Sequence, residues 1–139
     1  MSSARSEIGT IGFIGLGVMG EPMCGHLARR SGKRVLAHDL RPEPVERLAA
    51  FGVTAATLPE LAAQADVIVM SLPDGKAVDA VVTALEPHLR AGQCVVDTST
   101  SSVSLTRRIG ERLAAKGVQY ADAPVARTRE AAAKGDLSI

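Results

Sequence analysis

The sequence predicts a single α/β domain built on a doubly wound parallel sheet, and two observations support this prediction. Short apolar runs of strand length alternate with amphipathic helical patterns, which is typical of parallel strands joined by helices that cover both faces. The run at 67–70 is apolar throughout, as expected of a central strand. A chain of 139 residues is long enough for one such domain with a hydrophobic core.

The first unit is a strand, a glycine-rich turn, a helix and a second strand that ends in an acid. The strands lie at 11–14 and 34–38, the glycine pattern lies at 15–20, and the acid is Asp39. In such a pattern Gly15 lets the backbone turn out of the strand, Gly17 leaves room for a pyrophosphate, and Gly20 lets the helix pack closely. Free N–H groups at the helix N-terminus suit the phosphates, and an acid about twenty residues on reaches the adenosine ribose. The unit predicts a Rossmann-type fold that binds a dinucleotide. The alternative is that the glycine pattern is only an incidental turn.

The next two elements are a helix and a short strand. Pro42 and Pro44 stand near the first turn of a helix that runs to about Phe51, and Gly52 ends it. A brief strand follows near Val53.

The remaining elements continue the alternation. They are a helix at 58–64, a strand at 67–71, a helix between Asp74 and Pro87, a strand at 93–97, a helix around 105–113 that Gly117 ends, a strand at 119–121, a turn through Pro124, a short helix at 128–134 and a strand at 137–139. Asp74 is expected to cap its helix and Pro87 to end it. The residues expected to face the core from these helices are Val78, Val81, Val82, Leu85, Leu105, Ile109 and Leu113.

Three apolar side chains recur at four-residue spacing after the glycine pattern. They are Met19, Met23 and Leu27. This spacing favours packing against the sheet over a metal or redox site.

Composition excludes several classes of partner and site. Sixteen basic and fifteen acidic residues give a net charge of +1, which provides no field to attract nucleic acid or an anionic membrane. No apolar run approaches the length of a membrane span, and the tail at 1–7 is polar and lacks a signal core. Only Cys24 and Cys94 are present, without metal-ligand spacing. We therefore expect no metal site and a reducing, cytoplasmic setting.

Four stretches together resemble the β-hydroxyacid dehydrogenase family, which includes 3-hydroxyisobutyrate dehydrogenase and, more distantly, 6-phosphogluconate dehydrogenase. The first is 12–23, where Met19 before the third glycine and Met23 after Pro22 are family marks. The others are Leu72-Pro73, the stretch 97–100, and the stretch 122–125 followed later by 135–137. The match covers the chain from Ile8 to Ile139, with 8–139 as a dinucleotide-binding domain after the tail.

The resemblance and the glycine pattern together imply where the cofactor binds. The expected cofactor-binding residues are Phe13, Ile14, Gly15, Leu16, Gly17, Val18, Met19, Gly20, Asp39, Leu40, Arg41, Leu72, Pro73 and Thr100. Leu72 and Pro73 would line the pocket and Thr100 would lie near the nicotinamide and the substrate. The alternative keeps Pro73 and Thr100 as turn formers, with Thr100 capping the helix that begins at Val103.

The acid at the end of the second strand bears on which cofactor is used. A carboxylate at Asp39 would repel the 2′-phosphate of NADP, which favours NAD. Arg41, two residues later, could pair with a phosphate, so NADP stays open as the alternative.

After 122–125 the chain departs from the common family pattern of Ser-Gly-Gly. Here Ala126, Arg127 and Thr128 resemble the Gly-Arg-Thr variant of sulfolactaldehyde reductases, in which the arginine is directed at a sulfonate. The resemblance implies that Arg127, with Thr128 as a hydroxyl donor, binds a small anionic substrate through its planar donor fork. The alternative is that Arg127 is a solvated charge at a helix start.

The family's general acid is a lysine on the first long helix of an all-helical second domain, and no lysine of this chain matches that motif. The sequence therefore provides no catalytic residue, and we expect a chain truncated before that domain and inactive alone. The full-length protein is expected to be a homo-oligomer. Two functions remain open: the cofactor-binding domain of an NAD(P)-dependent hydroxyacid oxidoreductase, and a free-standing nucleotide-sensing module.

Overall fold

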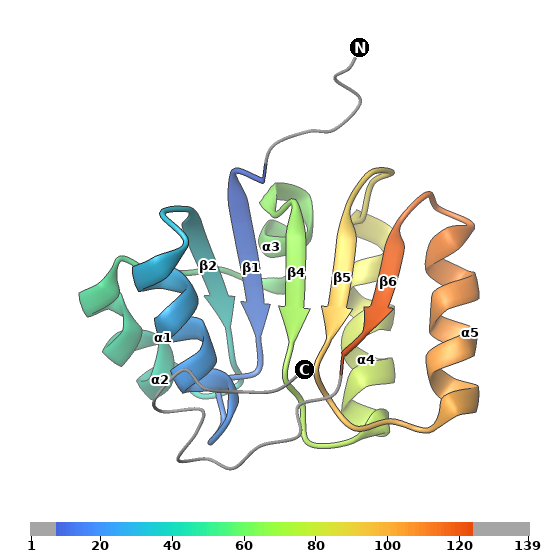
Figure 1. Ribbon diagram of the computed structural model, residues 1–139, viewed down its shortest axis with the longest axis horizontal. Coiled ribbons are helices and arrows are strands. Elements are labelled where there is room, and N and C mark those ends of the chain that lie inside the picture. Colours follow the sequence, from blue (N-terminus) through green and yellow to red (C-terminus); the bar gives the residue numbers. More distant parts are fainter. Residues whose placement is uncertain (1–7, 124–139) are drawn as a thin grey trace.

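The computed structural model describes residues 8–123, which form a six-stranded parallel sheet between two layers of helices (Figure 1). The strand order is β3-β2-β1-β4-β5-β6. The strands are β1 (Thr10–Ile14), β2 (Arg34–His38), β3 (Thr54–Ala55), β4 (Val67–Met70), β5 (Cys94–Asp97) and β6 (Gln119–Asp122). The helices are α1 (Gly20–Arg30), α2 (Pro42–Leu48), α3 (Leu58–Gln64), α4 (Gly75–Leu85) and α5 (Val103–Ala114), with 3-10 turns η1 (Ala49–Phe51) and η2 (Glu86–His88). The predicted α/β fold with a doubly wound parallel sheet is confirmed, whereas the elements predicted within 124–139 lie outside the described residues.

Side chains from alternate positions of the strands pack into two hydrophobic clusters, one on each face of the sheet. In β1, Phe13 belongs to the cluster with α1 and α2, whereas Ile14 belongs to the cluster with α3, α4 and α5. In β2, Ala37 belongs to the cluster with α1 and α2, and Leu36 belongs to the cluster with α3, α4 and α5. This alternation follows from the two-residue period of a strand. In Figure 1, α1 lies in front of the sheet and α3 and α4 lie behind it.

The two helical layers cover the sheet unequally within the described part of the chain. Phe13 is aligned with Ala37 and Val69, and the same row continues through Val96 to Ala121. Phe13 and Ala37 are buried, Val69 and Val96 are half-buried, and Ala121 is exposed. The layer of α1 and α2 therefore covers β1 and β2 and leaves β4 to β6 partly open. The expected cover on both faces extends further on the side of α3, α4 and α5, where Ile68 and Val95 are fully buried.

Local signals place several helix ends as expected. Asp74 caps α4 by accepting a hydrogen bond from the N–H of Ala77 (2.9 Å). Gly52 takes the left-handed conformation (φ 85°) after η1, as a glycine at a helix end does readily. At α5 the cap is Ser102, whose hydroxyl accepts from the Leu105 N–H, so the alternative role of Thr100 as this cap is wrong.

The short strand also differs slightly from its prediction. It lies at Thr54–Ala55, and Val53 before it is buried against α1 and α2. Its two residues pair with Leu36 and Ala37 at the edge of the sheet.

Candidate functional site

A pocket of about 740 Å³ opens at the carboxyl edge of the sheet, beyond the ends of β1, β2 and β4. It lies at the switch point of the strand order, because β1 continues to β2 on one side and pairs with β4 on the other. Ligands of open α/β sheets bind at this position. Its lining consists of Ile14, Gly15, Gly17, Val18, Met19, Gly20, His38, Asp39, Leu40, Arg41, Leu58, Ser71, Leu72, Pro73, Ala77, Ala80 and Val81.

The three glycines of the loop before α1 have different surroundings. Gly15 has a φ of 97°, and a Cβ there would meet the carbonyl oxygen of Ser71. A Cβ on Gly20 would meet the carbonyl oxygen of Gly15, so this glycine lets α1 start close to the loop. A Cβ on Gly17, by contrast, would have nothing within 4 Å. Packing within the described residues therefore requires Gly15 and Gly20, whereas Gly17 borders open space.

Backbone donors of the loop are free to bind an anion. The N–H groups of Gly17, Val18 and Met19 have no hydrogen-bond acceptor among residues 8–123. They precede the N-terminus of α1, where the helix dipole also favours negative charge. An open space at Gly17 and free donors beside it fit a pyrophosphate, so the residues present fit a dinucleotide.

The carboxylate of Asp39 connects the end of β2 to the glycine loop. It accepts hydrogen bonds from the backbone N–H groups of Leu16 (2.6 Å) and Arg41 (2.9 Å). The Arg41 guanidinium lies 3.5 Å from the carboxylate, and its other end donates to the carbonyl of Leu16 (3.4 Å). The Asp39 side chain is only 12% exposed, whereas that of Arg41 is 61% exposed. This acid is therefore held in one orientation at the pocket wall.

The charge state of Asp39 follows from opposing effects. Burial opposes ionisation, but the backbone hydrogen bonds from Arg41 and Leu16 and the charge of Arg41 together outweigh it and lower the pKa of Asp39. Asp39 is therefore a carboxylate at neutral pH.

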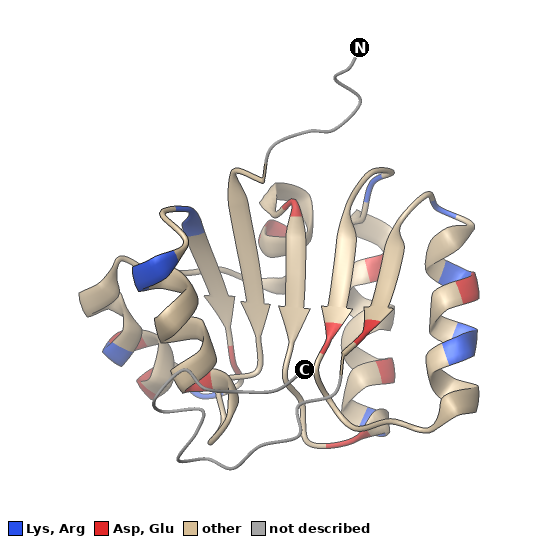
Figure 2. Cartoon of the chain, in the orientation of Figure 1, with Lys and Arg blue, Asp and Glu red and all other residues tan. Residues whose placement is uncertain are grey.

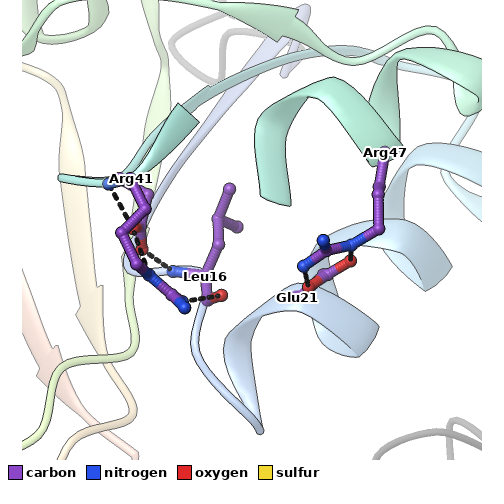
Figure 3. Close-up of polar contacts among 5 residues, drawn as sticks. Leu16, Glu21, Arg41 and Arg47 are labelled. Carbon is purple, nitrogen blue, oxygen red and sulfur yellow. Dashed lines mark hydrogen bonds and ion pairs between the residues drawn. The ribbon is translucent and has the colours of Figure 1, made fainter. Parts of the chain in front are cut away.

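A second acid near the loop is neutralised by a neighbouring helix. Arg47 on α2 donates two hydrogen bonds to Glu21 in the first turn of α1, at 2.8 and 2.7 Å (Figure 3). These hydrogen bonds, which outweigh the effect of burial, lower the pKa of Glu21. Glu21 and Arg47 line a groove beside the pocket. The negative charge of Glu21 next to the proposed phosphate position is therefore offset by Arg47.

Most of the predicted cofactor-binding residues lie in the pocket wall, and three do not. Phe13 is fully buried in the cluster under α1 and α2. Leu16 is also buried and borders the groove beside the pocket. Thr100 is exposed just beyond β5 and does not line the pocket. Arg127 and Thr128 lie outside the described residues.

Two predictions concern Met19, cofactor binding and packing against the sheet, and its position contradicts only the packing. Met23 and Leu27 pack against the cluster on the α1 side as expected. Met19 instead precedes the helix and lines the pocket, so the four-residue spacing does not place it in the core.

Sequence reasoning missed the part of the wall formed by His38, Leu58, Ser71, Ala77, Ala80 and Val81. A signal for three of these was present, because α4 begins directly after Pro73 and its first turns must lie near the same edge. Leu58 enters the wall from the start of α3, which only the tertiary fold determines.

Two further observations concern other kinds of site. No group of three or more His, Cys, Asp or Glu residues within 8–123 could hold a metal ion. In the same part of the chain, every helix is too short or too polar to cross a membrane.

Comparison with known protein families identifies the domain to which this fold belongs. Residues 10–139 match the family described as the NAD-binding domain of 6-phosphogluconate dehydrogenase. The chain belongs to this family.

Dehydrogenases are among the relatives of this NAD-binding domain. The chain is 38% identical over 133 residues to 2-(hydroxymethyl)glutarate dehydrogenase of Eubacterium barkeri, covering 93% of this chain and 44% of that protein. The solved structure of Mycobacterium tuberculosis 3-hydroxyisobutyrate dehydrogenase with L-serine has a TM-score of 0.87 at 34% identity, covering 94% of this chain and 45% of that one. The chain thus spans a little under half the length of these relatives.

A third structure bears on the cofactor. It is a protein called Psf3 in complex with NADP⁺ and 2-OPP, with a TM-score of 0.81 and 28% identity, covering 91% of this chain and 46% of that one. A related protein therefore holds NADP⁺, and membership of the family alone leaves the choice between NAD and NADP open.

Proposed function

We propose that this NAD-binding domain belongs to an oxidoreductase that transfers hydride between a small anionic β-hydroxyacid and its semialdehyde or keto form. The pocket carries the proposal, since its glycine loop has an open position at Gly17 and free N–H groups at the start of α1. The bound cofactor would supply the hydride. The relatives named above are enzymes, which favours this function over a nucleotide-sensing module.

The same geometry supports NAD over NADP. Asp39 is an ionised, largely buried carboxylate at the end of β2, where an adenosine ribose would lie. Arg41, the nearest cation, is already paired with this acid and with the Leu16 carbonyl. A 2′-phosphate would therefore lie against a carboxylate whose paired cation is already engaged, whereas ribose hydroxyls could donate to Asp39.

The test of cofactor binding is calorimetric titration of the protein and of an Asp39→Asn variant with NAD and NADP. Repulsion at about 5 Å in a partly solvated site is on the order of 1–2 kcal/mol, so the preference for NAD should fall roughly 5- to 30-fold. Glu21→Gln is the control, because it removes an equal charge from the neighbouring groove and should leave the preference unchanged. Failure of the wild-type protein to bind either cofactor would refute the proposed function.

For the substrate we propose an anion held by Arg127, with Thr128 and Thr100 as hydroxyl donors. This part rests on the resemblance of 126–128 to the sulfolactaldehyde reductase variant and on the chemistry of a guanidinium fork. Arg127→Ala should raise the KM for anionic substrates by about tenfold or more, with the affinity for NAD unchanged. Steady-state kinetics on the full-length protein test this, and an unchanged KM would contradict it.

We place the remaining parts of the reaction outside this chain. The lysine general acid of the family would belong to a helical domain in the half of the relatives that the chain does not span. A homo-oligomer and a cytoplasmic setting are proposed on the family resemblance and on the two free thiols, Cys24 and Cys94.

A further inference from the structure

Three side chains form a series of hydrogen bonds from β6 across the carboxyl ends of β5 and β4. The Tyr120 hydroxyl donates to Asp97 Oδ2 (2.7 Å). Asp97 Oδ1 accepts from the N–H of Ser99 (2.9 Å), and Ser99 Oγ accepts from the N–H of Leu72 (2.8 Å). These contacts join residues that are 23 and 27 positions apart in the sequence.

The centre of this series is a buried acid. Asp97 is fully buried and Ser99 is nearly so, and no ion pair within residues 8–123 includes Asp97. Figure 2 shows acidic residues at the carboxyl ends of β5 and β6. A buried carboxylate is costly unless donors surround it, so the Tyr120 hydroxyl and the Ser99 N–H fix its position. Burial, followed by the hydrogen bond to Asp97, raises the pKa of Tyr120, which keeps its hydroxyl a donor.

The series ends at the wall of the cofactor pocket. Leu72 and Pro73 line the pocket directly after β4. A second contact nearby ties the same strands, because the Thr98 hydroxyl and N–H both donate to the carbonyl of Met70, at 2.7 and 2.9 Å. The position of Leu72 and Pro73 is therefore set by β5 and β6, although neither Asp97 nor Tyr120 lines the pocket.

Topology determines which part of a dinucleotide this wall would meet. Asp39 marks the adenosine side on β2, and the pyrophosphate would cross at the glycine loop after β1. The other nucleotide then lies on the side of β4 and β5.

We propose that Tyr120 is a positioning residue, which acts through Asp97 and Ser99 to hold Leu72 and Pro73 against the nicotinamide half of the cofactor. This inference rests on the proposed function. It assigns a role to a side chain of β6 that has no contact with the pocket.

The experiment compares NADH with ADP-ribose, which lacks the nicotinamide and shares the rest of the molecule. Calorimetry on the full-length protein gives the ratio of the two dissociation constants for the wild type, for Tyr120→Phe and for Ser99→Ala. Tyr120→Phe removes the phenolic donor, and Ser99→Ala removes the acceptor for the Leu72 N–H. Each should weaken NADH binding about three- to tenfold and change ADP-ribose binding by less than about twofold.

Gln93→Met is the matched control for a general loss of stability. Gln93 is nearly as buried as Asp97 and donates to the carbonyls of Ala62 (2.6 Å) and Ala65 (2.7 Å), but it lies just before the opposite end of β5. This variant should lower the Tm and leave the ratio of the two affinities unchanged. Hydrogen exchange supplies a second readout, in which the Leu72 amide should exchange faster in Tyr120→Phe and at its wild-type rate in Gln93→Met.

The outcomes separate the two proposals. If the wild type binds both ligands and neither Tyr120→Phe nor Ser99→Ala changes the ratio, the positioning role is refuted and the proposed function stands. If the wild type binds neither ligand, both proposals fail. Should Tyr120→Phe not fold, Ser99→Ala decides the question by the same ratio.

Discussion

Substitutions at Gly15 and Gly17 should separate the stability of the fold from cofactor binding. A side chain at Gly15 should mainly lower the stability, whereas one at Gly17 should mainly weaken binding. A side chain at Gly17 would project into open space, and its backbone does not have a positive φ. Gly17→Val should therefore change the free energy of unfolding by no more than about 0.5 kcal/mol. Gly15→Ala combines a left-handed backbone with a contact to the Ser71 carbonyl, at about 1–2 and about 1–3 kcal/mol respectively, so about 2–5 kcal/mol of stability should be lost.

Cofactor binding, compared at equal amounts of folded protein, should be weakened more by Gly17→Val than by Gly15→Ala. The valine at Gly17 would occupy the proposed pyrophosphate position and block free N–H groups of the loop. Loss of two hydrogen bonds to a charged group at about 1.5 kcal/mol each weakens binding by about 3 kcal/mol, or roughly 100-fold. Urea unfolding and calorimetry with NADH measure the two quantities. Wild-type affinity in Gly17→Val, or a stability loss equal to that of Gly15→Ala, would refute the reasoning.

Two further predictions concern titratable groups. Hydrogen bonds from the backbone N–H groups of Thr10 and Gly9 lower the pKa of Asp66, so its contribution to stability is full above the unfolded pKa of about 3.9 and is lost as the pH falls through the lower folded value. Asp66→Asn should therefore be less stable than the wild type at pH 7 and converge with it in urea unfolding as the pH falls below the folded pKa of Asp66, and parallel curves would contradict this. Burial raises the pKa of Cys24 to about 12, so a thiol reagent at pH 8 should modify this residue only in denaturant, and rapid modification in native buffer would overturn its placement in the core.

The features that the sequence predicted well depend on local chemistry. Gly15 follows a strand and must take a positive φ, Asp74 precedes a helix that needs a cap, and Leu105, Ile109 and Leu113 repeat at a helical period. Each signal lies within a few residues of its structural effect. For the same reason the residue pattern alone locates the glycine loop and the strand ends around the pocket.

The features that it did not predict depend on long-range contacts. One exception is local: the four-residue spacing gives Met19 a packing role, but α1 begins one residue later and Met19 lines the pocket, a shift below what periodicity resolves. The hydrogen bond between Asp39 and the Leu16 N–H joins positions 23 apart, and that between Tyr120 and Asp97 does the same. Such pairs become visible only once the register of the sheet is known.

The pocket walls and the hydrogen bonds that support them come from different parts of the sequence, and this has a consequence for synthesis of the chain. Among residues 8–123 the pocket is lined by residues from Ile14 to Val81, so a growing chain has all of these once Val81 has been added. The ties that hold Leu72 come later, since Ser99 and Asp97 belong to β5 and its margin and Tyr120 to β6. The ribosome therefore completes the walls of the site first and supplies their outer support only as β5 and β6 emerge.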